Sequence, residues 1–154
     1  MDEVERLPSD ELFRFLKLSY GILQRPFEEL FKGELTALQL HVLYELKVGG
    51  KASVTALSER LRIPKQQMSK LLSKLAGAGY IRRVPVPDDR RSVMLEISER
   101  TSAILDDRCS KYIEKFRNVL VREGIESESF MSAVRLLSDT LECIHEDKYT
   151  SDDI

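Results

Sequence analysis

The segment Pro64–Gly79 carries the side chains of this chain that are best suited to binding an anionic partner. Read at helical spacing, its apolar residues Met68, Leu72 and Leu75 fall on one face, which must pack against a core. The opposite face carries amides, hydroxyls and lysines, and it contains no carboxylate. Such a mixture complements a ligand that presents negative charge together with hydrogen-bonding groups, as the edge of a DNA major groove does. The polar side chains on this face and its flanks are Lys65, Gln66, Gln67, Ser69, Lys70, Ser73 and Lys74.

Positive charge is concentrated around this segment. Residues 51–100 hold 11 Lys and Arg against 5 Asp and Glu, a balance of +6. The rest of the chain holds 13 against 21, a balance of -8, so the formal net charge of -2 hides a basic segment inside an acidic frame. This asymmetry predicts a localised anion-binding surface.

The bulk composition narrows the functional classes. A chain of 154 residues suits one domain that buries a core without disulfides or metal ions. It has no apolar run long enough to span a bilayer, and its acidic start is unlike a signal peptide. Cys109 and Cys143 lie far apart, and His41 and His145 are the only histidines. We therefore expect a cytoplasmic protein with no metal and no cofactor. Without a phosphate-binding loop or a nucleophile motif, we expect no enzyme.

Helical periodicity predicts the elements that precede the basic segment. The first helix begins near Ser9, is apolar on more than one face, and is interrupted near Arg25 by Pro26. A second helix begins at Thr36, which is expected to form a capping box with Gln39. The buried stripe of this second helix is predicted to be Leu38, Val42, Leu43 and Leu46.

A helix-turn-helix and a hairpin follow. A short third helix, capped by Ser53, precedes residues 64–79, and two short helices joined by a tight turn form a helix-turn-helix. Residues 80–86 favour β structure, and residues 92–97 alternate as a half-buried strand. The turn Pro87–Arg91 between them carries two arginines. This order predicts a mainly α fold with a small antiparallel β-wing, which is a winged helix-turn-helix lobe.

Two more helices complete the chain. One begins at Ser98 and ends at Gly124, and the other runs from about Ser127 to His145. The last helix carries a heptad-like apolar seam, as a helix that packs lengthwise against another helix would. The seam residues are Phe130, Val134, Leu137, Leu141 and Ile144.

These motifs resemble the multiple-antibiotic-resistance-regulator (MarR) family of bacterial winged-helix transcription factors. The similarity covers most of the chain and is close between Leu35 and Leu105. Residues 57–63 are similar to the helix and turn of the family, and residues 68–81 to its recognition helix and exit. Asp88–Arg91 is similar to the wing signature of the family, and Ser98 stands where the family has a capping threonine.

The resemblance implies a homodimeric repressor that binds a pseudo-palindromic operator in double-stranded DNA. The first and last helices of the two subunits would interleave, leaving a winged lobe on each subunit to bind one half-site. The apolar character of those helices agrees with this arrangement. We therefore expect the DNA-binding lobe at residues 36–97 and the dimerisation region at residues 9–33 and 98–146.

Individual roles follow from the resemblance and from side-chain chemistry. Lys65, Gln66, Gln67, Ser69 and Lys70 are expected to face the major groove, and Ser69, Ser73 and Lys74 to reach phosphates. Arg90 is the candidate for the minor groove, and Asp88 is expected to pair with a wing arginine and hold the hairpin in shape. Arg91, Arg82 and Arg83 are candidates for contacts to the DNA backbone.

The resemblance also implies that a small aromatic or anionic effector controls release of the DNA. The aromatic residues that are candidates for lining an effector pocket are Tyr20, Phe27, Phe31, Tyr44 and Tyr112. Cys109 and Cys143 lie on or beside apolar stripes, which favours buried, inert thiols over the alternative of a thiol-based redox sensor. A second alternative, a winged helix used for protein contacts, predicts a neutral or acidic recognition face.

Overall fold

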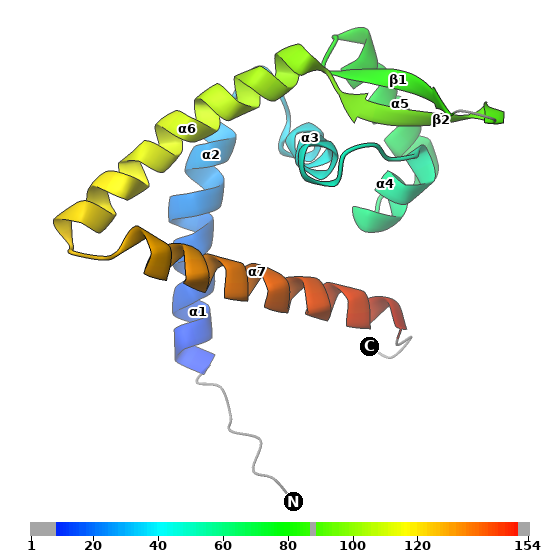
Figure 1. The fold of residues 1–154 in the computed structure, drawn as a ribbon. Helices are drawn as coiled ribbons and strands as arrows, with labels where there is room; N and C mark the ends of the chain where they lie inside the picture. Colours follow the sequence, from blue (N-terminus) through cyan, green and yellow to red (C-terminus); the bar gives the residue numbers. More distant parts are fainter. Residues whose placement is uncertain (1–8, 87–88, 151–154) are drawn as a thin grey trace, which may run out of the picture. The chain divides into compact units, whose positions relative to one another are not determined.

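The computed structural model describes residues 9–86 and 89–150, with the side chains of residues 9–86 and 93–144. It is mainly helical with one two-stranded antiparallel sheet (Figure 1), so the predicted fold class is confirmed. The chain forms two compact units, residues 1–109 and 110–154. The elements are α1 (Ser9–Leu18), the π-helix η1 (Ser19–Gln24), α2 (Arg25–Glu29), α3 (Ala37–Gly49), α4 (Val54–Arg60), α5 (Lys65–Gly77), β1 (Ile81–Val86), β2 (Asp89–Ile97), α6 (Glu99–Arg122) and α7 (Ser127–Thr150).

The first helical stretch runs through α1, η1 and α2 along one axis, and Pro26 accounts for its irregular middle (Figure 1). Pro26 has no backbone N–H and cannot make the usual helical bond to the carbonyl four residues earlier. The turn before it widens to π geometry, in which the backbone N–H of Arg25 donates to the carbonyl of Tyr20. The predicted interruption near Arg25 is therefore present as a π-helical turn rather than a break.

Helix α3 lies at the centre of the first unit. Its predicted capping box is confirmed, because the Gln39 amide donates to Thr36 Oγ1 at 3.2 Å and the Thr36 amide donates to Gln39 Oε1 at 2.9 Å. One predicted core residue is wrong: Leu38 is only half-buried, and Leu40 is buried instead. The reason is that α3 is apolar on several faces and packs on more than one of them. Its buried residues are Leu40, Val42, Leu43 and Leu46.

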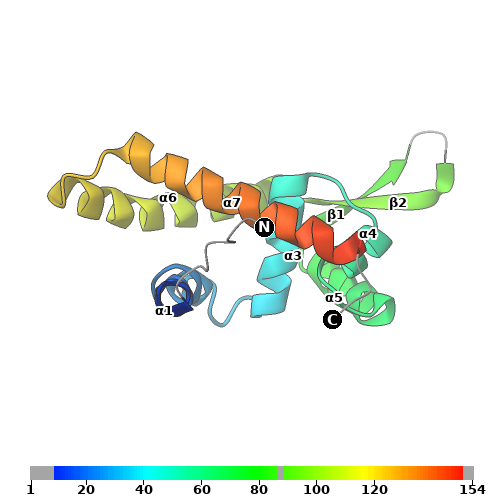
Figure 2. The ribbon, with the colours of Figure 1, turned by 90° about the horizontal axis from the view of Figure 1, so that it is seen from below.

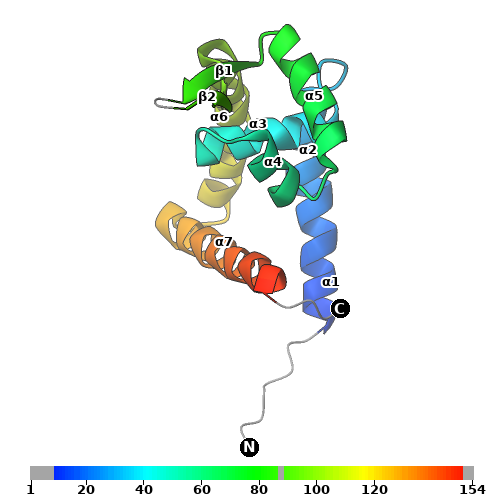
Figure 3. The ribbon, with the colours of Figure 1, turned by 90° about the vertical axis from the view of Figure 1, so that its right-hand side faces the viewer.

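Helices α4 and α5 lie beside α3 and complete the core of the lobe (Figure 3). Leu57 of α4 and the predicted stripe of α5, Met68, Leu72 and Leu75, are each at most 2% exposed. Leu95 of β2 joins the same core, as its place on the inward face of the alternating strand predicts. These contacts fix the orientation of α5, so its outward face is also fixed.

The hairpin of β1 and β2 projects beyond the helices of the lobe (Figure 2). Its strands pair from Ile81 opposite Ile97 to Pro85 opposite Val93. Ala52, in the loop before α4, exchanges both backbone hydrogen bonds with Leu95, at 3.0 and 2.8 Å. The base of the hairpin is therefore bonded to the helix-turn-helix.

The second unit contains the C-terminal part of α6 and all of α7. Gly124, with φ of 67°, terminates α6, and the rings of Phe116 and Phe130 stack with centroids 6.4 Å apart. The predicted seam on α7 is exposed at Val134, Leu137, Leu141 and Ile144. Within residues 9–86 and 89–150, no helix is both long and apolar enough to cross a membrane.

Candidate nucleic-acid interface

Helix α5 holds the candidate DNA-reading side chains on a rigid base. Pro64 precedes its first residue, Lys65, and none of the residues before the helix supplies a side-chain cap. The helix ends in a Schellman motif, in which Tyr80 N–H donates to Leu75 O at 2.9 Å and Gly79 N–H to Ala76 O at 3.0 Å. Gly79 has φ of 78°, a conformation that glycine adopts without strain.

The predicted polar face of α5 is exposed along its whole length. All of its members lie on the solvent side, opposite the buried stripe, and α5 contains no acidic residue. The backbone amides of the first turn of α5 point out of the N-terminal end of the helix, where they attract an anion. The exposed residues are Lys65, Gln66, Gln67, Ser69, Lys70, Ser73 and Lys74.

The turn between α4 and α5 contains a feature that the periodicity did not predict. Ser58 Oγ donates to the carbonyl of Ile63 at 2.6 Å, and the Ile63 amide donates to Ser58 O at 3.0 Å. Between them, Arg62 has φ of 52° and an exposed side chain. This turn therefore places the cationic residue Arg62, in a left-handed backbone conformation, shortly before α5.

Two wing arginines predicted to contact DNA lie on β1. Arg82 and Arg83 are both exposed, but Arg82 pairs with Glu96 across the strands. Lys51 Nζ lies 3.4 Å from the other carboxylate oxygen of Glu96. Desolvation raises the pKa of Glu96, but the charges and hydrogen bonds of Arg82 and Lys51 outweigh it and hold that pKa below its usual range. Arg82 is therefore partly neutralised, whereas sequence reasoning treated it as equivalent to Arg83.

The tip of the wing differs from the predicted turn at Pro87–Arg91. Strand β2 begins at Asp89, so the backbone of Arg90 and Arg91 is already strand. Pairing of the two strands extends further than local turn propensity suggests, because Val86 pairs with Asp89. Asp88 lies outside the described residues, as do the side chains of Arg90 and Arg91.

Polar contacts tie the start of α6 to the rest of the first unit. Lys47 Nζ donates to Ser102 Oγ at 2.5 Å and to Asp106 Oδ2 at 2.7 Å. Arg108 donates to Leu30 O at 2.7 Å and to both carboxylate oxygens of Glu34, at 2.8 and 3.1 Å. These contacts hold α3 and the α2–α3 loop against α6.

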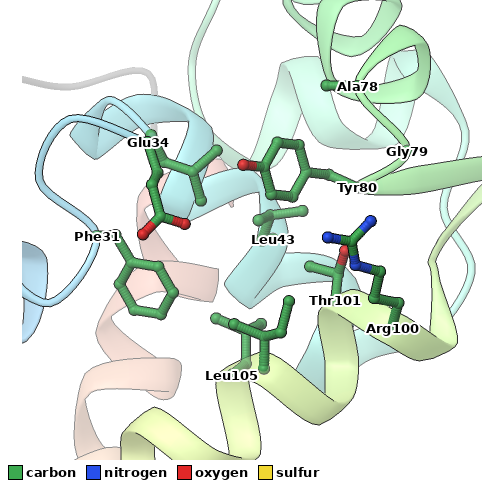
Figure 4. Close-up of a pocket in the computed structure, with 11 residues that line it drawn as sticks. Phe31, Glu34, Leu43, Ala78, Gly79, Tyr80, Arg100, Thr101 and Leu105 are labelled. Carbon is green, nitrogen blue, oxygen red and sulfur yellow. The ribbon is translucent and has the colours of Figure 1, made fainter.

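The predicted aromatic pocket is divided in the structure. Phe31 lines a cavity of about 100 Å³ between the α2–α3 loop, the α5–β1 junction and α6 (Figure 4). Phe27 and Tyr44 line a separate hollow beside η1, with ring centroids 5.4 Å apart. Tyr20 is 55% exposed, and Tyr112 belongs to the second unit. The predicted aromatic residues therefore do not line one common pocket, because Phe31 faces the first cavity while Phe27 and Tyr44 face the second.

The Figure 4 cavity has charged groups at its two ends that the aromatic pattern did not predict. Figure 4 shows Glu34 and Arg100 at opposite ends, with Tyr80 and Leu43 between them. Glu34 is already bonded to Arg108. The guanidinium of Arg100 is therefore the charged group of the wall that can bind an anion.

Among the side chains that the structure describes, Cys109, Cys143 and His41 give no sign of a chemical site. Cys109 is half-buried, and burial together with Asp106 raises its pKa, which lowers its thiolate fraction. Cys143 is exposed in the single chain, contrary to the expectation of burial, because its apolar neighbours on α7 are exposed too. His41 lies 3.8 Å from Glu28. Among the described residues, no cluster of His, Cys, Asp and Glu could hold a metal ion.

The fold is that of a winged helix-turn-helix protein, and the exposed polar face of α5 is its candidate DNA-binding surface. Residues 34–92 match the model of the MarR family, the family that the sequence motifs resemble.

Curated relatives agree with this assignment. The chain is 25% identical over 117 residues to the transcriptional regulator PecS of Dickeya dadantii (strain 3937), a match that covers 73% of this chain and 70% of PecS. It is 27% identical over 73 residues to the multiple antibiotic resistance protein MarR of Salmonella typhimurium, covering 47% of this chain and 51% of MarR. PecS is named as a transcriptional regulator, which agrees with the expectation of a regulator rather than an enzyme.

Solved structures match nearly the whole chain. A MarR family protein from Bacillus stearothermophilus superposes with a TM-score of 0.68 at 21% identity, covering 94% of this chain and 98% of that protein. Wild-type MarR from E. coli in its apo form gives a TM-score of 0.59 at 20% identity, covering 89% and 99%. At these sequence identities, the similarity shows that this chain and the two solved proteins share a fold.

Proposed function

We propose that this chain is a transcriptional repressor that binds a pseudo-palindromic operator as a homodimer and releases it when a small effector binds. One observation carries the DNA-binding part of the proposal. The polar face of α5 is exposed and free of acids, while Met68, Leu72 and Leu75 hold the opposite face in the core. A helix fixed in this way can present its polar side chains to the major groove as a rigid body.

The chemistry of α5 suits direct reading of bases. Gln66 and Gln67 can donate to and accept from adenine at once, and Lys65 and Lys70 can reach the acceptors of guanine. The residues of α5 that contact phosphates position the helix without reading the base sequence, because phosphates are the same at every base pair. We assign that positioning role to Ser69, Ser73 and Lys74.

The hairpin supplies a second set of contacts. We propose that Arg90 enters the minor groove, where narrow A·T-rich stretches attract arginine. Arg91 and Arg83 contact the DNA backbone in this proposal, and Asp88 holds the hairpin in shape. Arg82 contributes less to DNA binding because it forms an ion pair with Glu96. The loop anchor at Ala52 keeps this hairpin in register with α5.

Exposed apolar side chains support the homodimer. Phe13 on α1 is 68% exposed and Leu141 on α7 is 53% exposed, and many of their apolar neighbours are also exposed. A monomer rarely leaves continuous apolar surface in water. A second copy of the chain would cover these helices and set two α5 helices about 34–36 Å apart, one turn of DNA.

The effector is best accommodated by the Figure 4 cavity. Its floor is apolar, and Arg100 brings a cation to one end, which favours a small organic anion. The cavity touches both the end of α5 and the start of α6, so a bound molecule would change how these helices meet. Benzoate is a suitable probe, added to the preformed protein–DNA complex.

The decisive experiment is fluorescence anisotropy of the full chain on DNA from upstream of its own gene and on random DNA, across a salt series. A preference of about 10³-fold or more, with one dimer bound per site, is the expected result. Equal and weak binding to both DNAs contradicts a specific regulator of that site. Absence of binding at low salt contradicts the DNA-binding function.

Charge reversal separates DNA binding from the rival use of this face for protein contacts. The double variant Lys65→Glu, Lys70→Glu is expected to abolish DNA binding while keeping its fold, because both side chains are exposed. Lys115→Glu with Arg117→Glu on α6 changes the net charge equally and is the matched control, and sedimentation equilibrium checks that it remains a dimer because α6 lies in the proposed dimerisation region. If both double variants weaken binding alike, the effect is one of net charge and α5 is not the interface.

A further inference from the structure

A row of three charged side chains crosses the base of the hairpin. Arg82 on β1 lies opposite Glu96 on β2, and Arg82 Nε donates to Glu96 Oε1. On the other side of β2, Ala52 of the α3–α4 loop pairs with Leu95 in the antiparallel sense. This register sets Lys51 opposite Glu96, and Lys51 Nζ lies 3.4 Å from Glu96 Oε2. One carboxylate therefore joins both strands of the hairpin to the α3–α4 loop.

The charge of Glu96 is unfavourable on a surface that binds an anion. Among the hairpin side chains that the structure describes, residues 81–86 and 93–97, Glu96 is the only acidic one. Its side chain is 16% exposed, whereas those of Arg82 and Lys51 are 58% and 54% exposed. A negative charge in a basic lobe weakens the attraction for DNA, and here it also pairs with two cations. If charge alone mattered, removing this carboxylate would strengthen DNA binding.

The place of Glu96 in the hairpin indicates what its carboxylate contributes instead. The sheet has two strands and projects beyond the helices of the lobe (Figure 2). A two-stranded hairpin alone is at best marginally stable in water, so its direction depends on what holds its base. Without the carboxylate, Lys51 and Arg82 would be like charges on one face of the sheet, and like charges there repel. Glu96 therefore replaces repulsion at the base of the hairpin with attraction.

The base of the hairpin controls the position of its tip because the strands are long. Arg90, the residue proposed to enter the minor groove, lies on β2 about 20 Å along an extended strand from Glu96. Over that length, a tilt of about 10° at the base moves the tip by roughly 3 Å. A hydrogen bond is lost over a shift of this size. The contact of the tip with DNA thus depends on the angle at which the base is held.

We propose that Glu96 is a positioning residue for DNA binding, which holds the hairpin at the angle where Arg90 reaches the minor groove while α5 lies in the major groove. This inference rests on the proposed function, because it concerns how two contacts with the same DNA are set relative to each other. Glu96 does not touch the DNA and acts through Arg90. Its removal therefore weakens DNA binding, which is opposite to the effect of its charge alone.

The test is a double-mutant cycle of Glu96→Gln and Arg90→Ala, measured by anisotropy on the upstream DNA at low salt, where weak complexes are measurable. Glutamine keeps the size of the side chain and removes its charge. Glu96→Gln is expected to lower affinity roughly three- to tenfold in the otherwise wild-type chain. When residue 90 is alanine, the loss is expected to be less than about twofold, because the tip has no contact left to lose.

Glu96→Asp is a second variant for the same cycle, because it shortens the reach of the carboxylate by one methylene and keeps the charge. It is expected to lose affinity in the same Arg90-dependent way. Thermal unfolding followed by circular dichroism checks that each variant is folded at the temperature of the binding measurement. Glu99→Gln, which removes an exposed carboxylate at the start of α6, is the matched control and is expected not to lower affinity.

Two results would overturn the positioning role of Glu96 and leave the proposed function standing. Affinity in Glu96→Gln that equals or exceeds that of the wild type would mean that the carboxylate only neutralises Arg82 and Lys51. An equal loss with arginine and with alanine at residue 90 would mean that the effect does not pass through the tip of the hairpin. Failure of the wild-type chain to bind any DNA overturns the proposed function and this inference with it.

Discussion

Gln67 and Arg82 illustrate how differently two exposed polar residues of one lobe are constrained. Gln67 stands exposed on α5, and α5 contains no acidic residue to compete for its amide. Arg82 stands on β1 opposite Glu96 and forms an ion pair with it. Gln67 therefore keeps the role in base recognition that we propose for it, while part of the charge of Arg82 serves the hairpin.

Gln67→Ala is expected to change which operator sequence the protein prefers. A bidentate contact between an amide and adenine discriminates against other bases by about 1–3 kcal/mol, and alanine removes it. Competition binding against operators changed one base pair at a time measures the effect. Ser73→Ala, a phosphate-side variant, should weaken all operators alike, and an unchanged preference in Gln67→Ala would show that this residue does not face the bases.

Tyr44 carries a buried hydroxyl for which the described structure supplies no hydrogen-bond partner. Tyr44→Phe removes that group and keeps the ring, so the free energy of unfolding is expected to rise by about 1 kcal/mol. Urea unfolding at neutral pH measures the change. A loss of stability in Tyr44→Phe would mean that the hydroxyl is bonded in the folded protein in solution.

The same residue predicts a pH dependence. Burial raises the pKa of Tyr44, with smaller contributions from Cys109 and Glu28. Above the ordinary tyrosine pKa of about 10, the unfolded chain loses this proton while the folded chain keeps it, so stability falls as pH rises. Tyr44→Phe should lose less stability than wild type between neutral and alkaline pH, and equal losses would contradict the assignment.

At the scale of the element, caps and turns decide how each helix begins and ends. Thr36 and Gln39 bond each other's backbone at the start of α3, and Ser98 Oγ accepts from the Thr101 amide at 3.2 Å at the start of α6. Ser98 Oγ also donates to Gly79 O at 2.8 Å, so one side chain links the start of α6 to the end of α5. The caps therefore stabilise individual helices and also join them.

Thr36→Ala is expected to lower the free energy of unfolding by about 1 kcal/mol, because the hydrogen bond from the Gln39 amide to the Thr36 hydroxyl oxygen is lost. Urea unfolding followed by circular dichroism measures this loss. Thr36→Ser keeps the oxygen and should retain most of the stability. If serine is as damaging as alanine, the methyl group of the threonine matters more than the cap.

At the scale of the whole molecule, the distribution of exposed apolar residues sets the expected assembly. In the lobe, the apolar side chains converge on one core around Leu43 and Leu72. On α1 and on the seam of α7 they remain exposed, and Leu16, for example, is 52% exposed. This contrast supports the proposed homodimer, in which a second copy of the chain would cover α1 and the seam of α7.

Leu141→Glu is expected to shift the protein from dimer to monomer, because it places a charge in the seam of α7. Sedimentation equilibrium measures the shift, and operator affinity should fall with it because one lobe alone binds one half-site. Ser138→Glu, also exposed on α7, adds the same charge outside the seam and serves as control. If the Leu141→Glu variant remains a dimer, the seam of α7 is not part of the dimer interface.

The sequence by itself determined the helices, their caps and the polar face of α5. Each of these depends on side chains within a few residues of one another, as in the capping box at Thr36 or the buried stripe at Met68, Leu72 and Leu75. Periodicity and local hydrogen bonding are properties of a short segment, so they can be predicted before the chain is folded.

Only the tertiary structure decided features that depend on residues distant in sequence. The choice of Leu40 over Leu38, the pairing of Arg82 with Glu96, and the separation of Phe31 from Tyr44 all follow from how elements pack. The left-handed Arg62 likewise follows from how α4 must turn into α5. Local sequence leaves these outcomes open, because the partners that select among them come into contact only when the core forms.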